Sequence, residues 1–299
     1  EKTKKIWNME TKMLLSIFTP TYNRRNKLEQ LYRSLKNQID DECEWIIVDD
    51  GSTDATEKVI LQFCNESVCN IRYIKKENGG KHTAHNLAVD FAKGDYFMCL
   101  DSDDFLQDQA IAKLLKFINT CENNEGIIAY KCDQSGKLLS DEFPLVDRID
   151  NIYMLEKKYE CRGEFTFVFP THILRNNKFP VYSGEKFITE SVLYDRLELR
   201  MKLFPEIMEV CEYQEEGLSN NLNKIMKKNP AGYCLYFMQK IDMQNNLKKR
   251  IEMIGKYLSF CLLSGKKRTV YKGKYTSLVI CCYPIGIIFW IYYKLVRKL

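Results

Sequence analysis

Three carboxylates lie within four residues in the first half of this 299-residue chain. Asp101, Asp103 and Asp104 directly follow residues 96–100, which are all apolar or aromatic. A short apolar run bounded by polar residues indicates a buried strand. Carboxylate oxygens at the end of such a strand suit Mg²⁺ or Mn²⁺ bound together with a substrate phosphate. The pattern therefore predicts a site for a metal-bound diphosphate.

Asp101 and Asp103 enclose Ser102, and the alternation of an extended chain turns both carboxylates to one side. One of them could then hold a ribose while the other binds the metal. The alternative is an acidic loop that caps the following helix, because acidic clusters are common on protein surfaces. The apolar strand in front of the cluster favours the site.

A second acidic pair, Asp49 and Asp50, follows the apolar residues 45–48. A carboxylate here can accept the N–H of a uracil or of another base edge, and Gly51 permits a tight turn. Helix capping by the next two hydroxyl residues is the alternative. A phospho-acceptor aspartate of a receiver-type domain also needs an acidic pair, but this chain runs well past the size of such a domain.

A loop with two glycines, residues 78–81, precedes a helix expected at 82–93. Its backbone amides and Lys81 could lie near a diphosphate, and His85 and Asn86 could face the nucleotide from the helix. The alternatives are a simple turn for the glycines and a structural role for the histidine.

Two glutamates, Glu185 and Glu190, are candidates for a general base that takes a proton from an incoming hydroxyl. They are five residues apart and would not share a face of a regular helix, so we expect at most one of them to be the base. Solvent-exposed glutamates at a helix start are the alternative for each. Apolar spacing predicts an amphipathic helix over 192–203.

Apolar stretches that alternate with helical patterns must position these residues. The strands expected in the first half cover 14–19, 45–48, 71–74 and 96–100, and those of the second half cover 126–132, 165–169 and 207–213. This alternation predicts an α/β fold with a mostly parallel central sheet flanked by helices and ligands at the carboxyl ends of its strands. Two helices from residue 229 onward predict a C-terminal helical extension.

The composition is that of a globular chain, with 45% hydrophobic and 28% charged residues. The formal net charge of +5 is too small to indicate a nucleic-acid partner, and the basic residues concentrate in the last third. The twelve cysteines and three histidines show no zinc spacing, so we expect free thiols in the cytosol. The polar residues 1–12 contain no apolar core of a signal peptide.

Residues 276–293 contain no charge and lie between a basic segment, 266–274, and the basic residues Lys294 and Arg297. Their length is at the short end of what spans a bilayer. Basic residues on both sides favour a segment that associates with the membrane surface through 266–299. A buried final helix or a contact within a homo-oligomer is the alternative.

The motifs, in their order and spacing, resemble glycosyltransferase family 2, which has the GT-A fold. The matching stretches are Thr19-Pro20-Thr21-Tyr22-Asn23-Arg24, Val48-Asp49-Asp50-Gly51-Ser52-Thr53-Asp54, Asn78-Gly79-Gly80-Lys81 with His85-Asn86, and Leu100-Asp101-Ser102-Asp103-Asp104. The Gly184–Glu190 stretch, taken with residues 216–219, looks like a subgroup found among bacterial polysaccharide-assembly enzymes.

The resemblance implies a set of site residues. Donor binding is expected from Thr19, Pro20, Tyr22, Asp50, Lys81, His85, Asn86, Asp101 and Ser102. Asp103 is expected to bind Mn²⁺ or Mg²⁺. Many members have an arginine where His85 stands, and many have a Glu-Asp pair whose aspartate is the base. Here that pair reads Glu185-Lys186, so Glu185 and Glu190 both remain candidates.

The resemblance further implies an inverting, metal-dependent transfer of a sugar from a nucleotide donor, expected to be UDP-linked, to a hydroxyl of a saccharide acceptor. We expect a lipid-linked or polysaccharide acceptor and a cytoplasmic enzyme at the inner face of the cell membrane. Residues 13–120 are expected to form the nucleotide-sugar half, 121–228 the acceptor half, and 229–299 a helical region. A sugar-nucleotidyltransferase and a non-catalytic membrane scaffold are the alternatives.

Overall fold

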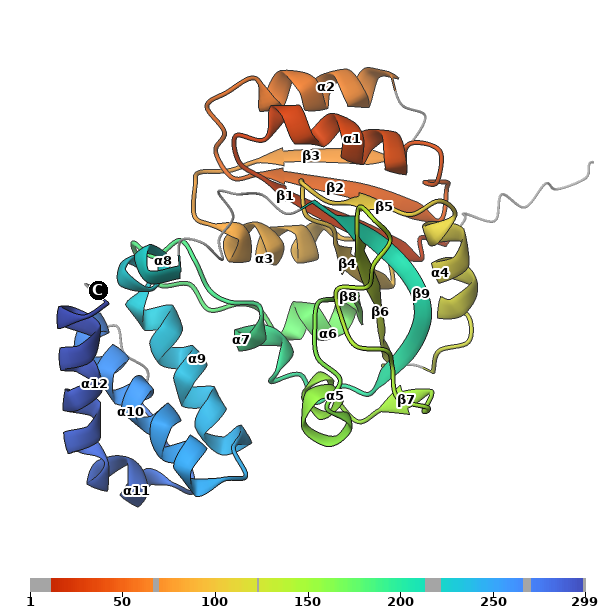
Figure 1. The fold of residues 1–299 in the computed structure, drawn as a ribbon. Coiled ribbons are helices and arrows are strands. Elements are labelled where there is room, and N and C mark those ends of the chain that lie inside the picture. The colour runs from red at the N-terminus through yellow and green to blue at the C-terminus, as the bar shows by residue number, and fades with distance from the viewer. Residues whose placement is uncertain (1–11, 67–69, 123, 213–221, 266–269, 298–299) are drawn as a thin grey trace, which may run out of the picture.

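The computed structural model describes residues 12–66, 70–122, 124–212, 222–265 and 270–297. Within these residues, a nine-stranded sheet carries helices on both faces, and a group of helices stands to one side of it (Figure 1). The strands are β1 (Leu15–Thr21), β2 (Cys43–Asp49), β3 (Ile71–Lys75), β4 (Tyr96–Cys99), β5 (Phe105–Leu106), β6 (Gly126–Asp133), β7 (Arg148–Ile149), β8 (Phe165–Pro170) and β9 (Met201–Cys211). The helices of the sheet region are α1 (Arg25–Leu35), α2 (Thr56–Glu66), α3 (Lys81–Phe91), α4 (Ala110–Ile118), α5 (Ile152–Tyr159), α6 (Thr171–Asn176) and α7 (Ser191–Tyr194).

The strands are arranged in the order β3-β2-β1-β4-β8-β6-β9-β5, and β7 pairs with β9. The four strands of the first half pair in parallel, as the alternation of strands and helices predicts. The second half adds antiparallel pairs, between β8 and both β4 and β6, and returns to a parallel pair between β6 and β9. The expected α/β fold is therefore confirmed, with a mixed sheet in its second half.

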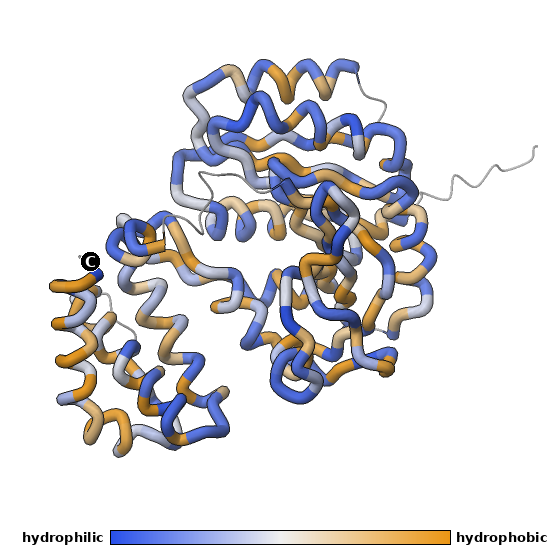
Figure 2. Tube along the Cα trace, viewed as in Figure 1, coloured by the Kyte–Doolittle hydropathy of each residue, from blue (hydrophilic) through white to orange (hydrophobic). Residues whose placement is uncertain are grey.

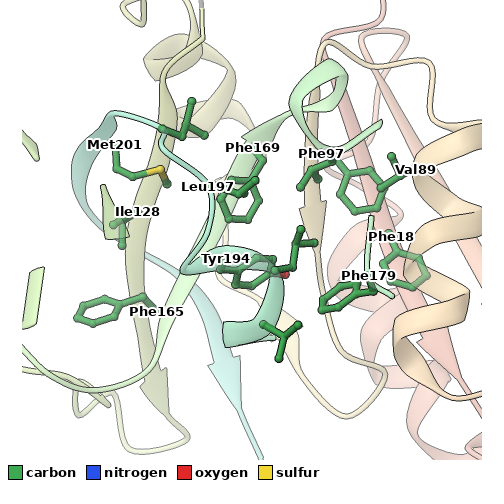
Figure 3. Close-up of a cluster of buried hydrophobic side chains, with 14 of the residues drawn as sticks. Phe18, Val89, Phe97, Ile128, Phe165, Phe169, Phe179, Tyr194, Leu197 and Met201 are labelled. Atoms are coloured by element: carbon green, nitrogen blue, oxygen red, sulfur yellow. The ribbon is translucent and has the colours of Figure 1, made fainter. Parts of the chain in front are cut away.

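Alternating side chains of the strands fill two hydrophobic layers, one on each face of the sheet. Phe18 of β1 belongs to the same buried cluster as Ala84 and Ala88 of α3. Its neighbour Ile17 belongs to a second cluster with Leu28 of α1. Figure 3 shows how the first cluster continues from these strands to the aromatic rings of β8 and α7. Both faces are buried because helices cover both, which is typical of parallel sheets.

The stretch after residue 190 differs from the prediction. The apolar spacing over 192–203 predicts a helix, but the structure has only the short α7, and β9 begins at Met201. This prediction was wrong because the residues that the pattern counted as one helical face are buried in a loop and in a sheet strand. Leu197 and Leu199, for example, are both buried between α7 and β9.

The C-terminal region is helical, as expected. It contains α8 (Leu222–Lys228), α9 (Pro230–Met243), α10 (Leu247–Ser264), α11 (Thr276–Cys281) and α12 (Tyr283–Leu295). α9, α10 and α12 pack around a third hydrophobic cluster, which includes Tyr233, Phe260 and Tyr293. The uncharged segment 276–293 is divided into two helices at Cys282. Among the described residues, no helix combines the length and apolar character needed to cross a membrane.

Candidate functional site

The carboxyl ends of β1, β2 and β4 lie side by side at one edge of the sheet. The amide of Asp50 donates to the Thr21 carbonyl at 2.9 Å, and the amide of Leu100 donates to the Phe18 carbonyl at 2.8 Å. The loops that leave these strands are also joined, because Asn23 accepts a hydrogen bond from the Thr53 amide through its side chain. The motifs that follow the three strands therefore meet in one place, where open α/β sheets bind their ligands.

Lys81, the first residue of α3, joins two distant segments at this edge. Its Nζ lies 2.7 Å from Asp101 Oδ1, after β4, and 2.7 Å from Glu190 Oε1, which directly precedes α7. Burial alone would lower the pKa of Lys81, but the carboxylates of Asp101 and then Glu190 outweigh it and hold this pKa well above its ordinary value. Burial would raise the pKa of Asp101, but Lys81 holds it below its ordinary value. Lys81 and Asp101 are thus both charged at neutral pH.

Asp103 presents a carboxylate beside this group. Its side chain is 25% exposed, and its nearest ionic partner is Arg24, 3.6 Å away. Within the described part of the chain, no cluster of three or more histidine, cysteine, aspartate or glutamate side chains could hold a metal ion by itself. Mg²⁺ is commonly bound through one or two carboxylates together with substrate phosphates. A lone accessible carboxylate therefore fits a metal that the protein holds jointly with a diphosphate.

The two candidate glutamates have different environments. Glu185 is 6% exposed, and its two oxygens accept hydrogen bonds from the amides of Ala231 and Gly232, at 2.8 and 2.9 Å. These amides belong to the first turn of α9, so Glu185 satisfies donors that a helix start leaves unpaired. Glu190 has a side chain that is 47% exposed and lies against Lys81. The structure therefore brings Glu190, and not Glu185, to the charged group.

The glycine loop, residues 78–81, is held by hydrogen bonds to Asp50. Its carboxylate accepts hydrogen bonds from the amides of Gly79 and Gly80, at 2.9 and 2.7 Å, and pairs with Lys76. Gly80 has a φ of +93°, and a Cβ there would lie 1.9 Å from the carbonyl oxygen of Lys186. Only glycine fits this position. Asp50 thus shapes the loop, and the loop supports the segment that carries Glu190.

Three other predicted donor residues make internal contacts. Thr19 is fully buried and accepts a hydrogen bond from the indole of Trp45 at 2.9 Å. The amide side chain of Asn86 donates to the Phe179 carbonyl and accepts from the Phe179 amide. His85 lies among aromatic rings, and neither of its ring nitrogens has a hydrogen-bond partner. These residues position the site from inside the fold, and we leave His85 out of the donor contacts proposed below.

The remaining predicted donor residues differ in exposure. Tyr22 is 47% exposed, Pro20 is half-buried, and Ser102 is buried between the two aspartates. Tyr22 therefore offers an exposed aromatic ring directly after the end of β1. The stretch 216–219 lies outside the described residues.

A second charged group was missed from the sequence. Lys131 of β6 pairs with the fully buried Glu209 of β9 at 2.7 Å and lies 3.7 Å from Asp104. Burial raises the pKa of Asp104 to about 7. Lys131 and Glu209 line a cavity of about 40 Å³ that they share with Lys81, Asp101 and Glu190. The signal in the sequence is Lys131 within an otherwise apolar strand, because a lysine at such a position is rarely buried without an ionic partner.

A family model described as glycosyl transferase family 2 matches residues 16–179, which include the motifs that follow β1, β2 and β4 and the glycine loop. The chain belongs to glycosyltransferase family 2. The family and the GT-A fold that the resemblance in its motifs predicts are therefore confirmed.

Some curated relatives that the chain matches over a short stretch are larger proteins. Chondroitin synthase of Pasteurella multocida is 42% identical over 103 residues, which are 34% of this chain and 11% of that protein. The chain thus matches about a tenth of the length of such a relative. Poly(ribitol-phosphate) beta-N-acetylglucosaminyltransferase TarP of Staphylococcus aureus is 25% identical over 290 residues, with 87% of this chain and 83% of that protein covered.

Solved structures share the fold at low sequence identity. TarS residues 1–349 of S. aureus, in complex with UDP-GlcNAc, has a TM-score of 0.62 and 16% identity, with 96% of this chain and 92% of that chain covered. The mannosyltransferase PcManGT of Pyrobaculum calidifontis, in complex with GDP-Man and Mn²⁺, has a TM-score of 0.52 and 13% identity, with 95% and 83% covered. At this level of identity, both show the architecture alone.

The different environments of the two glutamates predict different effects on stability. Glu185→Ala leaves two buried amides at the start of α9 without acceptors and should lower the free energy of unfolding by about 2 kcal/mol or more. Glu190→Ala should leave it within about 0.5 kcal/mol, because the side chain is half-exposed and Lys81 keeps Asp101 as a partner. Urea unfolding of both variants measures the difference. Equal destabilisation would contradict the assignment of Glu185 as a cap.

The burial of His85 should make the free energy of unfolding depend on pH. Burial lowers its pKa to about 3, whereas the histidine of the unfolded chain takes up a proton near pH 6.5. Its contribution to stability is therefore complete above about pH 6.5 and is lost as the pH falls toward about 3. His85→Phe should lose less stability than the wild type between pH 7 and pH 5 in urea unfolding. The exposed His172→Gln is the control, and it should follow the wild type.

Proposed function

We propose that this glycosyltransferase moves a sugar from a UDP-linked donor to a hydroxyl of a saccharide acceptor, with inversion at the anomeric carbon. The observation that carries the proposal is the group formed by Lys81, Asp101 and Glu190 at the carboxyl edge of the sheet, with Asp103 beside it. It unites an acidic loop suited to a metal-bound diphosphate with a glutamate that can accept a proton. A UDP-GlcNAc complex of TarS, which shares the fold, supports the choice of nucleotide.

In the proposed reaction, Glu190 Oε accepts the proton of the acceptor hydroxyl as the oxygen attacks the anomeric carbon. The bond to the diphosphate breaks on the opposite face, and UDP leaves with the electron pair, so the configuration is inverted. Asp101 orients the ribose, while Lys81 holds Asp101 and Glu190 in position through its two ion pairs. Glu185 acts indirectly, because its bonds to α9 fix the segment that ends at Glu190.

Asp103 is the residue that would hold the divalent cation, together with the donor's phosphates. When bound there, Mn²⁺ or Mg²⁺ would neutralise the charge that develops on the departing diphosphate. Arg24, 3.6 Å from Asp103, adds a positive charge on the same side. The Mn²⁺ complex of PcManGT, which shares the fold, supports a metal-dependent reaction.

The acceptor is proposed to be a cell-surface polysaccharide or its lipid-linked precursor. The similarity to TarP, a poly(ribitol-phosphate) beta-N-acetylglucosaminyltransferase, extends over 87% of this chain and supports a polymer acceptor. Residues 13–120 would form the donor half, 121–228 the acceptor half, and 229–299 a helical region that is joined to the acceptor half through Glu185. The enzyme would then work at the cytoplasmic face of the cell membrane.

The proposal predicts a metal-dependent release of UDP. Incubation with a panel of UDP-, GDP- and CDP-sugars, with Mn²⁺ or with EDTA, should release UDP from one donor only when the metal is present. Asp103→Asn should reduce this rate by about 100-fold or more, through loss of charge stabilisation of the leaving group. The neighbouring exposed Asp108→Asn is the matched control and should retain the wild-type rate.

The role of Glu190 has its own test. Glu190→Gln keeps the size of the side chain and removes the proton acceptor, so kcat should fall by about 100-fold or more while binding of UDP stays unchanged. Glu198→Gln, an exposed glutamate in the loop before β9, is the control. If no donor is hydrolysed or transferred and Asp103→Asn leaves UDP binding unaltered, the chain is a non-catalytic scaffold. If pyrophosphate is released from a nucleoside triphosphate and a sugar phosphate, it is a nucleotidyltransferase.

A further inference from the structure

The outer side of α11 and α12 exposes a continuous set of apolar side chains. Figure 2 shows that hydrophobic residues predominate along α12. Ile288 is 65% exposed and Leu295 is 74% exposed. The apolar face, as we call it, consists of Ile280, Tyr283, Ile287, Ile288, Ile291, Tyr292, Leu295 and Val296. Its members recur every three or four residues, which places them along one side of the helices.

The opposite side of α12 packs against α10. Gly286 and Tyr293 are buried, and a Cβ at Gly286 would lie 2.4 Å from the Cβ of Leu258 in α10. A Cβ at Gly255 of α10 would lie 2.7 Å from the ring of Phe289. The two helices therefore pack at very close range. This packing fixes α12 in rotation, so its apolar face points outward as a consequence of the fold.

The part of the sequence that carries the apolar face has charged residues of one sign, all of them basic. Glu252 is the last acidic residue of the sequence, and nine of the 45 lysines and arginines follow it. Because the whole chain has an excess of only five basic residues, the part up to Glu252 is acidic overall. Four of the nine are exposed in the described helices and their approach: Lys272, Lys274, Lys294 and Arg297. They stand at both ends of the apolar face.

Aromatic residues stand at the border between the apolar and basic parts. Tyr283 and Tyr292 are about half-exposed, and Lys294 Nζ lies 4.5 Å from the ring centre of Trp290. Tyrosine, tryptophan and the long stem of lysine are the side chains that gather where hydrocarbon meets water. An apolar face with aromatic and cationic borders is complementary to an anionic bilayer. A symmetric contact between two copies would instead bring like charges together.

We propose that the apolar face of α11 and α12 lies on an anionic lipid surface, with Lys272, Lys274, Lys294 and Arg297 at the headgroups. α12 is 13 residues long, and α10 covers its other side, so only the outer face enters the lipid. The helix lies in the plane of the membrane surface.

This placement also orients the site. The amides of Lys186 and Phe187 donate to the Asn229 side chain at 2.7 and 2.9 Å, and Glu185 binds the first turn of α9. The segment that ends at Glu190 is thus attached to the helices that carry the apolar face. If the proposed function holds, a lipid-linked acceptor would reach Glu190 from the surface on which the helices lie.

Vesicle co-sedimentation of the full chain, without any sugar donor, tests the membrane surface. The wild type should bind vesicles of phosphatidylglycerol and phosphatidylethanolamine at least tenfold more tightly than vesicles of phosphatidylcholine. The double substitution Ile288→Glu and Leu295→Glu should weaken binding to anionic vesicles at least tenfold. The matched control, Leu61→Glu with Leu145→Glu, changes two exposed leucines outside the apolar face and should bind as the wild type does.

Two double substitutions that remove basic side chains test whether the apolar face binds lipid or another partner. Lys294→Gln with Arg297→Gln should weaken binding to anionic vesicles and not to neutral ones, while Lys58→Gln with Lys116→Gln, also exposed, should have no effect. Equal vesicle binding by the wild type and the Ile288/Leu295 variant would overturn the proposal. So would a wild-type dimer or larger oligomer that ignores vesicles and dissociates in that variant, as measured by sedimentation velocity.

Unfolding curves of the variants should match the wild type, since every substituted side chain is exposed. UDP release in detergent solution should also be unchanged. The Ile288/Leu295 variant should lose vesicle binding and keep UDP release, whereas Glu190→Gln should keep vesicle binding and lose UDP release. The two measurements therefore distinguish a failure of the membrane proposal from a failure of the proposed function.

Discussion

The double ion pair of Lys81 is the interaction on which the site depends. Its ammonium joins Asp101, after β4, to Glu190, before α7, which lies 89 positions further along the sequence. The Lys81 side chain is 34% exposed, so water partly screens each ion pair, and the two pairs together hold both carboxylates beside the ammonium. The pairing therefore sets the separation between the acidic loop after β4 and the glutamate before α7.

Backbone contacts make this separation rigid. The carbonyl of Lys186 lies where a side chain at position 80 would be, so the glycine loop and the acceptor segment touch directly. Asp50 holds the loop by accepting hydrogen bonds from the amides of Gly79 and Gly80. Glu185 holds the segment by accepting hydrogen bonds from amides at the start of α9. The resulting chain of contacts runs from β2 through the site into the C-terminal helices. Geometry at the site and the orientation of those helices are thus linked.

Several residues of the recognised motifs serve the scaffold. Thr19 accepts a hydrogen bond from the Trp45 indole. Asn86 makes two hydrogen bonds to the backbone of Phe179, and His85 packs between aromatic rings. A motif records which residue types the family uses, whether they touch a ligand or hold the groups that do. Sequence reasoning assigns both kinds to the donor, because burial and hydrogen-bond partners are properties of the folded chain.

The sequence by itself determined the family, the parallel first half of the sheet and the strand ends at which the motifs meet, because strand periodicity and the short loop motifs are local. It also determined the charge and apolar character of the C-terminal segment. Only the tertiary structure shows that Glu190 pairs with Lys81 whereas Glu185 caps the start of α9, since the two differ only in what packs around them. It also replaced a predicted helix over 192–203 by a loop and β9, because buried side chains in a sheet mimic a helical pattern. The pairing of Lys131 with Glu209 and the outward direction of the apolar face likewise follow from contacts between distant segments.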